Sequence, residues 1–172
     1  MLRQLGFGLL SCLSITFVMA AIPVKADQIV GRASVVDGDT IEIAAQRIRL
    51  NGIDAPESWQ VCEDGARKPY RCGREAAFAL DDFLSRSQPT RCLAQGKDRY
   101  GRIVADCTRA DGASVNSWLV RHGWAIDWRL YSKGAFSAEQ MAAESTHAGI
   151  WRGTFELPCE VRASRWKRRP AC

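Results

Sequence analysis

The sequence lacks several features that mark other classes of protein. It contains no Cys-x-x-Cys pair, and His122 and His147 are its only histidines, so the ligand spacing of a zinc site is missing. It contains no internal repeat and no low-complexity tract, which gives no sign of a repeat architecture. No long apolar run follows residue 22, and we therefore expect no stable membrane association of the mature chain.

The one long apolar run, over residues 5–22, is typical of an export signal. Arg3 precedes the run, and the small residues after it favour cleavage after Ala26. A membrane anchor is the alternative, but polar residues interrupt the run and Pro23 ends it, so it is short for a stable span. We therefore predict that residues 1–26 are removed and that the protein is exported, either to the periplasm or out of the cell.

The mature chain, residues 27–172, carries 22 basic and 19 acidic side chains and is only mildly basic. Its length suits one domain with a proper core, and no second block of distinct composition is present. We assign that domain to residues 27–151. We expect residues 152–172 to form an irregular, basic, Cys-containing tail, and the protein to be a monomer.

Six of the seven cysteines remain after the signal is removed. In an exported protein, which reaches an oxidising compartment, these cysteines would form disulfides. Several pairings are possible, and local geometry favours Cys62–Cys72 across a loop, Cys92–Cys107 across a hairpin and Cys159–Cys172 in the tail.

Apolar and polar residues alternate over much of residues 28–54, which predicts half-buried strands. Residues 44–46 are predicted to connect two of them as a hairpin, so that Asp39 and Arg49 lie near each other. Two further strands are predicted over residues 90–95 and 103–108. The five strands, with a helix between the third and the fourth, predict an α+β, mainly β fold: an OB-type Greek-key barrel with about three helices.

The helices follow from apolar residues at helical spacing. Residues 74–87 predict the first helix, and residues 115–122 a short second one. A third is predicted over residues 137–148, with Ser137 as its N-cap and Gln140 completing a capping box. Proline and glycine make residues 55–73 a predicted loop.

Four acidic residues stand at the ends of the predicted hairpin strands, where side chains are held firmly. Asp37 and Asp39 flank a sharp turn, and Asp54 and Glu57 follow the facing strand. Taken singly, each could be a turn residue or a surface charge. Clustered carboxylates need a positive partner, and oxygen ligands without histidine or thiolate suit a hard ion such as Ca²⁺ or Mg²⁺. Asp39 and Asp54 are the preferred ligands.

Two arginines complete this pattern. Arg49 lies in the third predicted strand and Arg102 follows Tyr100-Gly101. A guanidinium matches two phosphate oxygens and can stabilise charge that develops at phosphorus, although either arginine could instead be a solvated surface residue. Glu57 suits a general base, since an ordinary glutamate is ionised at neutral pH.

The chain resembles the thermonuclease (staphylococcal nuclease-like) family. The resemblance covers about residues 28–151 and rests on five motifs in the same order: Val36-Asp37-Gly38-Asp39-Thr40, Arg49-Leu50-Asn51-Gly52-Ile53-Asp54-Ala55-Pro56-Glu57, Gly73-Arg74-Glu75-Ala76, Asp98-Arg99-Tyr100-Gly101-Arg102 and Gly149-Ile150-Trp151.

The resemblance implies an OB barrel in which a single Ca²⁺ supports hydrolysis of DNA and RNA, with single-stranded or unwound substrates preferred. It implies metal binding by Asp39, Asp54 and the backbone oxygen of Ala55. It also implies catalytic roles for Arg49, Glu57 and Arg102, and substrate contacts from Tyr100 and Tyr131. The chain departs from the family's pattern near residues 128–131, where only Tyr131 matches, and in its Cys-bearing tail.

Two other functions remain open on the sequence alone. One is a non-catalytic OB module that binds nucleic acid through basic and aromatic side chains, which would not need Glu57. The other is an accessory role in exopolysaccharide or envelope production, which some secreted proteins of this kind are thought to have.

Overall fold

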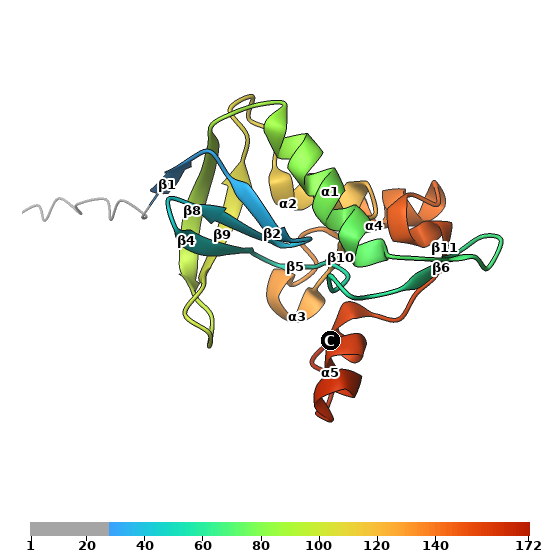
Figure 1. The fold of residues 1–172 in the computed structure, drawn as a ribbon. Coiled ribbons are helices and arrows are strands. Elements are labelled where there is room, and N and C mark those ends of the chain that lie inside the picture. Colours follow the sequence, from blue (N-terminus) through green and yellow to red (C-terminus); the bar gives the residue numbers. More distant parts are fainter. Residues whose placement is uncertain (1–27) are drawn as a thin grey trace, which may run out of the picture.

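A computed structural model describes residues 28–172, and the predicted export signal lies outside the described residues. Six strands form one curled sheet in the order β1-β8-β9-β4-β3-β2 (Figure 1). Their bounds are β1 (Gln28–Gly31), β2 (Ser34–Asp37), β3 (Thr40–Ile43), β4 (Gln46–Leu50), β8 (Thr90–Lys97) and β9 (Ile103–Thr108).

The sheet curls because its two edges belong to one bent stretch of chain. β1 pairs with β8 and β2 pairs with β3, yet only Arg32 and Ala33 separate β1 from β2. Both strands lie within residues 28–54, where strands were predicted, and the predicted barrel architecture is confirmed. β4 and β9 close the arrangement as a parallel pair, with Arg49 opposite Val104.

The β3–β4 hairpin is one residue tighter than predicted. Ile43 pairs with Gln46, so only Ala44 and Ala45 form the turn, with φ of 49° and 59°. Two successive positive φ angles are typical of the two-residue hairpin turn that matches the twist of paired strands. The register places Thr40 opposite Arg49, next to the acidic turn.

Residues 28–172 contain five α-helices, where about three were predicted: α1 (Cys72–Ser85), α2 (Val115–Arg121), α3 (Arg129–Ser132), α4 (Ser137–Ser145) and α5 (Pro158–Trp166). The first, second and third predicted helices correspond to α1, α2 and α4. The predicted capping box of α4 is wrong, because Phe136 is the N-cap and the Gln140 side chain instead accepts a hydrogen bond from the Asp127 N–H, 2.8 Å away.

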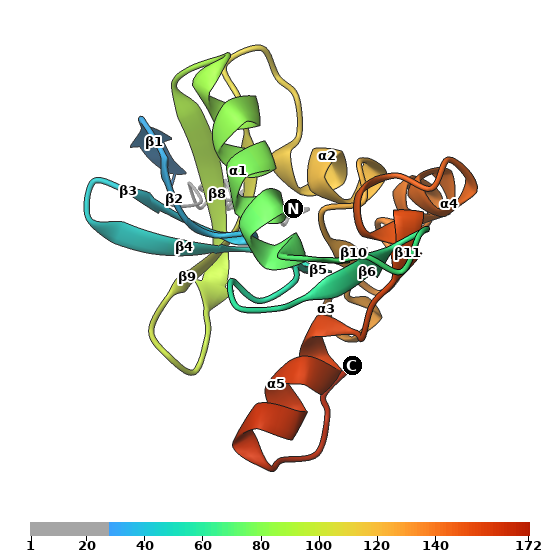
Figure 2. The ribbon, with the colours of Figure 1, turned by 45° about the vertical axis from the view of Figure 1, so that its right-hand side comes forward.

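The predicted irregular tail is wrong as well, since it contains α5. Pro158 occupies the first turn, where its missing N–H costs nothing, and Glu160 Oε2 accepts a hydrogen bond from the Leu157 N–H at 3.3 Å. In Figure 2, α5 projects away from the barrel on the same side as the β8–β9 connection.

The segment predicted as a loop after Glu57 also contains regular structure. β6 (Cys62–Asp64) pairs with β7 (Pro69–Tyr70) and with β11 (Gly153–Thr154), which follows the 3₁₀ helix η1 (Gly149–Arg152). A separate pair joins β5 (Ile53–Asp54) to β10 (Ile126–Asp127). Backbone pairing that connects segments far apart in sequence gives no short-range pattern, so composition alone did not predict these strands.

The main core lies inside the barrel, between the sheet and helices α1 and α2, and includes Ile41, Ile48, Leu50, Leu80 and Leu119. The three predicted disulfides are present, Cys62–Cys72, Cys92–Cys107 and Cys159–Cys172. Within residues 28–172, no helix is long and apolar enough to cross a membrane.

Candidate functional site

Arg49 joins two of the predicted acids beneath the barrel surface. Its guanidinium forms an ion pair with Asp39, and its Nη2 lies 2.9 Å from Asp54 Oδ1. Nη2 also donates to the Ile53 carbonyl oxygen at 3.2 Å. Exposed fractions are 7% for Asp39, 8% for Arg49 and 0% for Asp54. Charges this deeply buried need such partners, so the three side chains are fixed as one unit.

Asp39 also fixes the start of the Asp54–Glu57 segment. Its Oδ2 accepts a hydrogen bond from the Ala55 N–H at 3.0 Å, and its Oδ1 accepts one from the Thr40 hydroxyl at 3.1 Å. The buried Asp39 carboxylate thus connects the β2–β3 turn to the chain that leaves β5. This explains why two turns separated by a strand pair meet at one end of the barrel.

Glu57 is placed by a close backbone approach to α1. A Cβ at Gly73 would lie 1.8 Å from the Glu57 carbonyl oxygen, so a residue without a side chain is required there. Gln60 adds to the support, because its backbone N–H donates to the Glu57 carbonyl at 2.7 Å. The Glu57 side chain is 12% exposed. Burial raises the pKa of Glu57 above its ordinary value, and the neighbouring Arg162 lowers it in part.

Arg102 is held by a local turn around Asp98. Asp98 Oδ1 accepts hydrogen bonds from the backbone N–H groups of Tyr100 (2.9 Å) and Arg102 (3.0 Å), and its Oδ2 accepts one from Arg102 Nε at 2.7 Å. Burial opposes ionisation of Asp98, but these hydrogen bonds prevail and lower its pKa. Arg102 Nη1 then reaches back to the Thr40 hydroxyl, 3.4 Å away.

A third arginine, which the sequence did not single out, enters the site from α5. Arg162 donates from Nη1 and Nη2 to the two carboxylate oxygens of Asp54, each at 2.8 Å, and Nη1 also lies 2.7 Å from Glu57 Oε1. Although burial lowers its pKa, the two carboxylates raise the pKa of Arg162 above the usual arginine value. The proline that starts α5 was the one sequence signal that could have predicted this helix.

Two of the aromatic residues at the site come from the segment that follows β10. The Trp128 N–H donates to the Gly52 carbonyl at 2.9 Å, which sets α3 beside the turn between β4 and β5. The rings of Trp128 and Tyr131 meet edge to face at a centroid distance of 4.5 Å. Tyr131 and Tyr100 are 52% and 70% exposed, so both rings are available for contact with a ligand.

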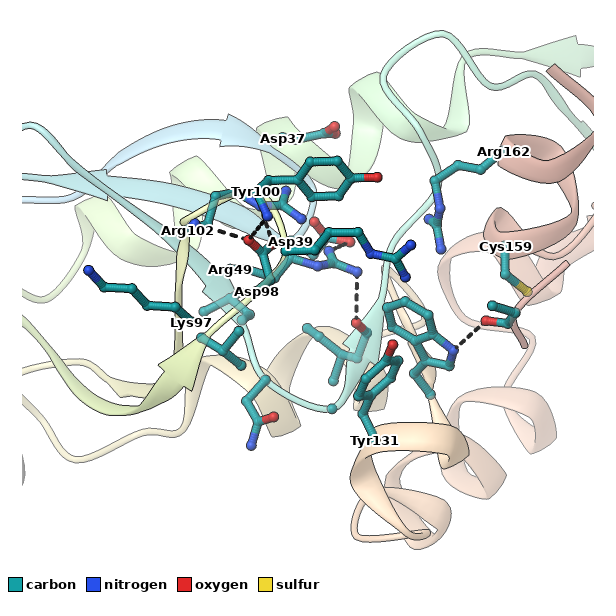
Figure 3. A pocket seen from close by; sticks show the side chains of 18 of the residues that line it. Asp37, Asp39, Arg49, Lys97, Asp98, Tyr100, Arg102, Tyr131, Cys159 and Arg162 are labelled. Atoms are coloured by element: carbon teal, nitrogen blue, oxygen red, sulfur yellow. Dashed lines mark hydrogen bonds and ion pairs between the residues drawn. The ribbon is translucent and has the colours of Figure 1, made fainter. Parts of the chain in front are cut away.

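These elements surround a cleft of about 920 Å³. Figure 3 shows Arg162 entering it from α5, opposite Tyr100 and Arg102. Eight residues were given metal-binding, catalytic or substrate-binding roles from the sequence, and six of them line the cleft: Asp39, Arg49, Glu57, Tyr100, Arg102 and Tyr131. Asp54 and Ala55 are buried behind it.

Side chains at this end of the barrel supply only some of the oxygen ligands that a hard cation needs. Within residues 28–172, no three His, Cys, Asp or Glu side chains gather closely enough to hold a metal ion by themselves. Asp39 and Asp54, which share the Arg49 guanidinium, offer carboxylate oxygens. A backbone carbonyl and water could complete the oxygen shell that such ions accept.

Comparison with known proteins identifies the family. The family model described as "Staphylococcal nuclease homologue" matches residues 47–153. The succinoglycan biosynthesis protein ExoI of Rhizobium meliloti is 54% identical over 147 residues, which cover 86% of this chain and 77% of that protein.

Other relatives are named as nucleases, and two of them cover most of the chain. An uncharacterized endonuclease of Escherichia coli is 33% identical over 79% of this chain and 86% of its own length. The micrococcal nuclease of Shigella flexneri is 27% identical over 87% of this chain and 86% of its own length. The chain, with its curled barrel and its buried Asp39–Arg49–Asp54 unit, belongs to the staphylococcal nuclease homologue family.

Proposed function

We propose that this protein is an exported, calcium-dependent nuclease that hydrolyses phosphodiester bonds of DNA and RNA. The observation that carries the proposal is the meeting of Arg49, Glu57 and Arg102 around one cleft, with Asp39 and Asp54 beside them. The names of the E. coli and S. flexneri relatives support the same reaction class. Export is supported by three disulfides, which persist in oxidising compartments.

In this proposal, Asp39, Asp54 and the Ala55 carbonyl would hold the Ca²⁺ ion. When bound, the ion would supply positive charge that polarises a phosphate oxygen. The fit rests on an all-oxygen donor set and on Arg49, which already neutralises part of the acidic charge.

The protein side chains perform the proton transfer and bind the phosphate. Glu57 accepts a proton from the water that attacks phosphorus, a role that needs a carboxylate within reach of the cleft. Arg102 lines the cleft from the β8–β9 connection and presents a guanidinium to the phosphate oxygens. Arg49, from β4, also lines the cleft. Both stabilise the charge that develops in the transition state. Tyr100 and Tyr131 offer ring faces for unpaired bases, which favours single-stranded or unwound substrates.

The experiment that tests this proposal measures release of acid-soluble nucleotides by purified residues 27–172. Release should require Ca²⁺ and stop with a chelator, and Glu57→Gln should lower kcat by about 100-fold or more. Glu63→Gln, at an exposed position of β6 outside the cleft, is the matched control and should retain full activity. Equal activity of Glu57→Gln and the unaltered protein would contradict the assignment of Glu57, and nucleic-acid binding without turnover would favour the non-catalytic alternative.

A second candidate function is a role in exopolysaccharide production. The observation that favours it is the 54% identity to the succinoglycan biosynthesis protein of R. meliloti. Deletion of the gene, with complementation by the unaltered protein and by Glu57→Gln, separates the two functions. If deletion abolishes exopolysaccharide production and Glu57→Gln restores it, the role does not depend on hydrolysis.

A further inference from the structure

The C-terminal segment beyond the family match forms one wall of the cleft. The family model ends at residue 153, whereas Arg162, Trp166, Arg168, Arg169 and Ala171 all line the cleft. The opposite wall is the β8–β9 connection, with Lys97, Arg99, Tyr100 and Arg102. Figure 2 shows α5 and this connection projecting in the same direction from the barrel.

One disulfide within the C-terminal wall and two contacts to the rest of the protein hold this wall in place. The Cys159–Cys172 disulfide closes the segment on itself. The Trp128 indole N–H donates to the Ala171 carbonyl at 3.0 Å, which attaches the end of the tail to the cleft floor. Arg162 attaches α5 to Asp54 and Glu57. The tail is therefore a built part of the cleft.

Nearly all the net charge of the protein is concentrated here. Residues 28–172 carry 22 basic and 18 acidic side chains. Eight basic and four acidic residues line the cleft, so the remainder of the described chain has fourteen of each and is neutral. A groove with this charge attracts a polyanion, and basic side chains lie on both of its walls.

Exposed aromatic rings narrow the class of polyanion. Tyr100, from the β8–β9 connection, and Trp166, from α5, line the cleft and are 70% and 62% exposed, and Tyr131, from α3, also lines it and is 52% exposed. Flat rings spaced along a cationic groove suit stacking of unpaired bases, while the arginines follow the phosphates. An acidic polysaccharide supplies the charge but has no flat base to stack.

We propose that α5 and the disulfide-closed tail form the second wall of a groove that binds single-stranded nucleic acid, with Arg168 and Arg169 contacting phosphates beyond the reaction site. This deepens the proposed function and rests on it for the choice of substrate. The tail then governs how tightly a long strand is held, whereas Arg49, Glu57 and Arg102 act at the bond that is cleaved.

The test measures binding of a fluorescent single-stranded oligonucleotide of about 20 residues to the mature chain, by anisotropy in chelator, at several salt concentrations. The double variant Arg168→Ala/Arg169→Ala should raise Kd about tenfold and reduce the slope of log K against log salt by about 1.4, because each single-strand phosphate contact contributes about 0.7. Arg71→Ala/Arg74→Ala, two exposed residues outside the cleft, is the matched control and should change neither quantity.

The double variant Cys159→Ser/Cys172→Ser tests the wall independently of charge, and it should also raise Kd. Unchanged Kd and salt slope in both double variants would overturn the proposal. Equal competition by polygalacturonate, at matched charge, would overturn the assignment to nucleic acid. Because binding is measured in chelator and without turnover, failure of the groove proposal can be distinguished from failure of the nuclease proposal. If hydrolysis occurs, Arg168→Ala/Arg169→Ala should raise KM for long strands, and Arg71→Ala/Arg74→Ala should leave it unchanged.

Discussion

Arg162 and Asp54 form a two-pronged ion pair, with Nη1 to Oδ1 and Nη2 to Oδ2 both at 2.8 Å. The pair joins α5 to β5, and a further bond of 2.7 Å connects Arg162 to Glu57. Both carboxylate oxygens of Asp54 therefore have a guanidinium partner, and Arg49 shares one of them. This geometry makes Arg162 a competitor of any cation that Asp54 binds.

We predict that Arg162→Gln strengthens Ca²⁺ binding about tenfold, which corresponds to about 1.4 kcal/mol. The physical reason is that the variant removes the positive partner of Asp54 Oδ2 and leaves Oδ1 paired with Arg49 alone. Calorimetric titration of the mature chain with Ca²⁺ measures the effect. Arg165→Gln, which removes an exposed arginine of the same helix, is the control and should leave the affinity unchanged. Weaker Ca²⁺ binding in Arg162→Gln would contradict the competition.

Asp98 is predicted to act through Arg102. Asp98→Ala removes the three hydrogen bonds that hold the Arg102 backbone, the Arg102 guanidinium and the Tyr100 N–H. Because a misplaced phosphate-binding group costs rate, nucleotide release should fall about tenfold to a hundredfold with little change in melting temperature. Asp111→Ala disrupts a comparable turn with Arg109 away from the cleft, and nucleotide release by that variant should match the unaltered protein.

The same carboxylate gives a pH prediction. The pKa of Asp98 lies below its ordinary value of 3.8 in the folded protein. Its contribution to stability is therefore complete above pH of about 3.8 and is lost as the pH falls through the lower folded value. Carboxyl NMR should give a titration midpoint for Asp98 below 3.8. A midpoint at or above 3.8 would show that the Arg102 contact does not form in solution.

Gly73→Ala should displace Glu57. The added Cβ would meet the Glu57 carbonyl oxygen at 1.8 Å and the Glu57 carbonyl carbon at 2.5 Å, and backbone atoms cannot rotate aside. We expect a loss of about 1–3 kcal/mol in the free energy of unfolding together with a fall in nucleotide release. Denaturant unfolding and the activity assay measure the two effects. Arg74→Ala, at the next position of α1, should preserve both, and normal activity of Gly73→Ala would contradict the close approach.

The cross-strand disulfide should matter for stability more than the tail disulfide. Cys92 and Cys107 face each other on β8 and β9 inside the core, and a cross-link spanning about 15 residues contributes about 3 kcal/mol. Replacing both by Ser should lower the unfolding free energy of the barrel by roughly that amount. Cys159→Ser/Cys172→Ser should leave barrel unfolding nearly unchanged, because that bond lies in the C-terminal segment. Chemical denaturation followed by tryptophan fluorescence compares the two variants.

Features encoded in short stretches were predicted closely. β9 begins and ends at the predicted residues, and the β3–β4 hairpin differs by one turn residue. The period of apolar residues and the local turn chemistry determine such elements. The capping of α4 was predicted wrongly because Gln140 hydrogen-bonds to Asp127 in a distant strand. Tertiary contacts of this kind override local capping preferences.

The sequence by itself determined the spacing of Asp39, Arg49, Asp54 and Glu57, and it favoured the cysteine pairs that the structure shows, because hairpin register and short loops favour local pairs. Only the tertiary structure determines the positions of Arg102 and Arg162 relative to the acidic residues. Arg102 returns to the acids through the parallel pairing of β4 with β9. Arg162 reaches Asp54 across 108 positions of chain. Packing between distant segments fixes both placements, and no local periodicity encodes such packing.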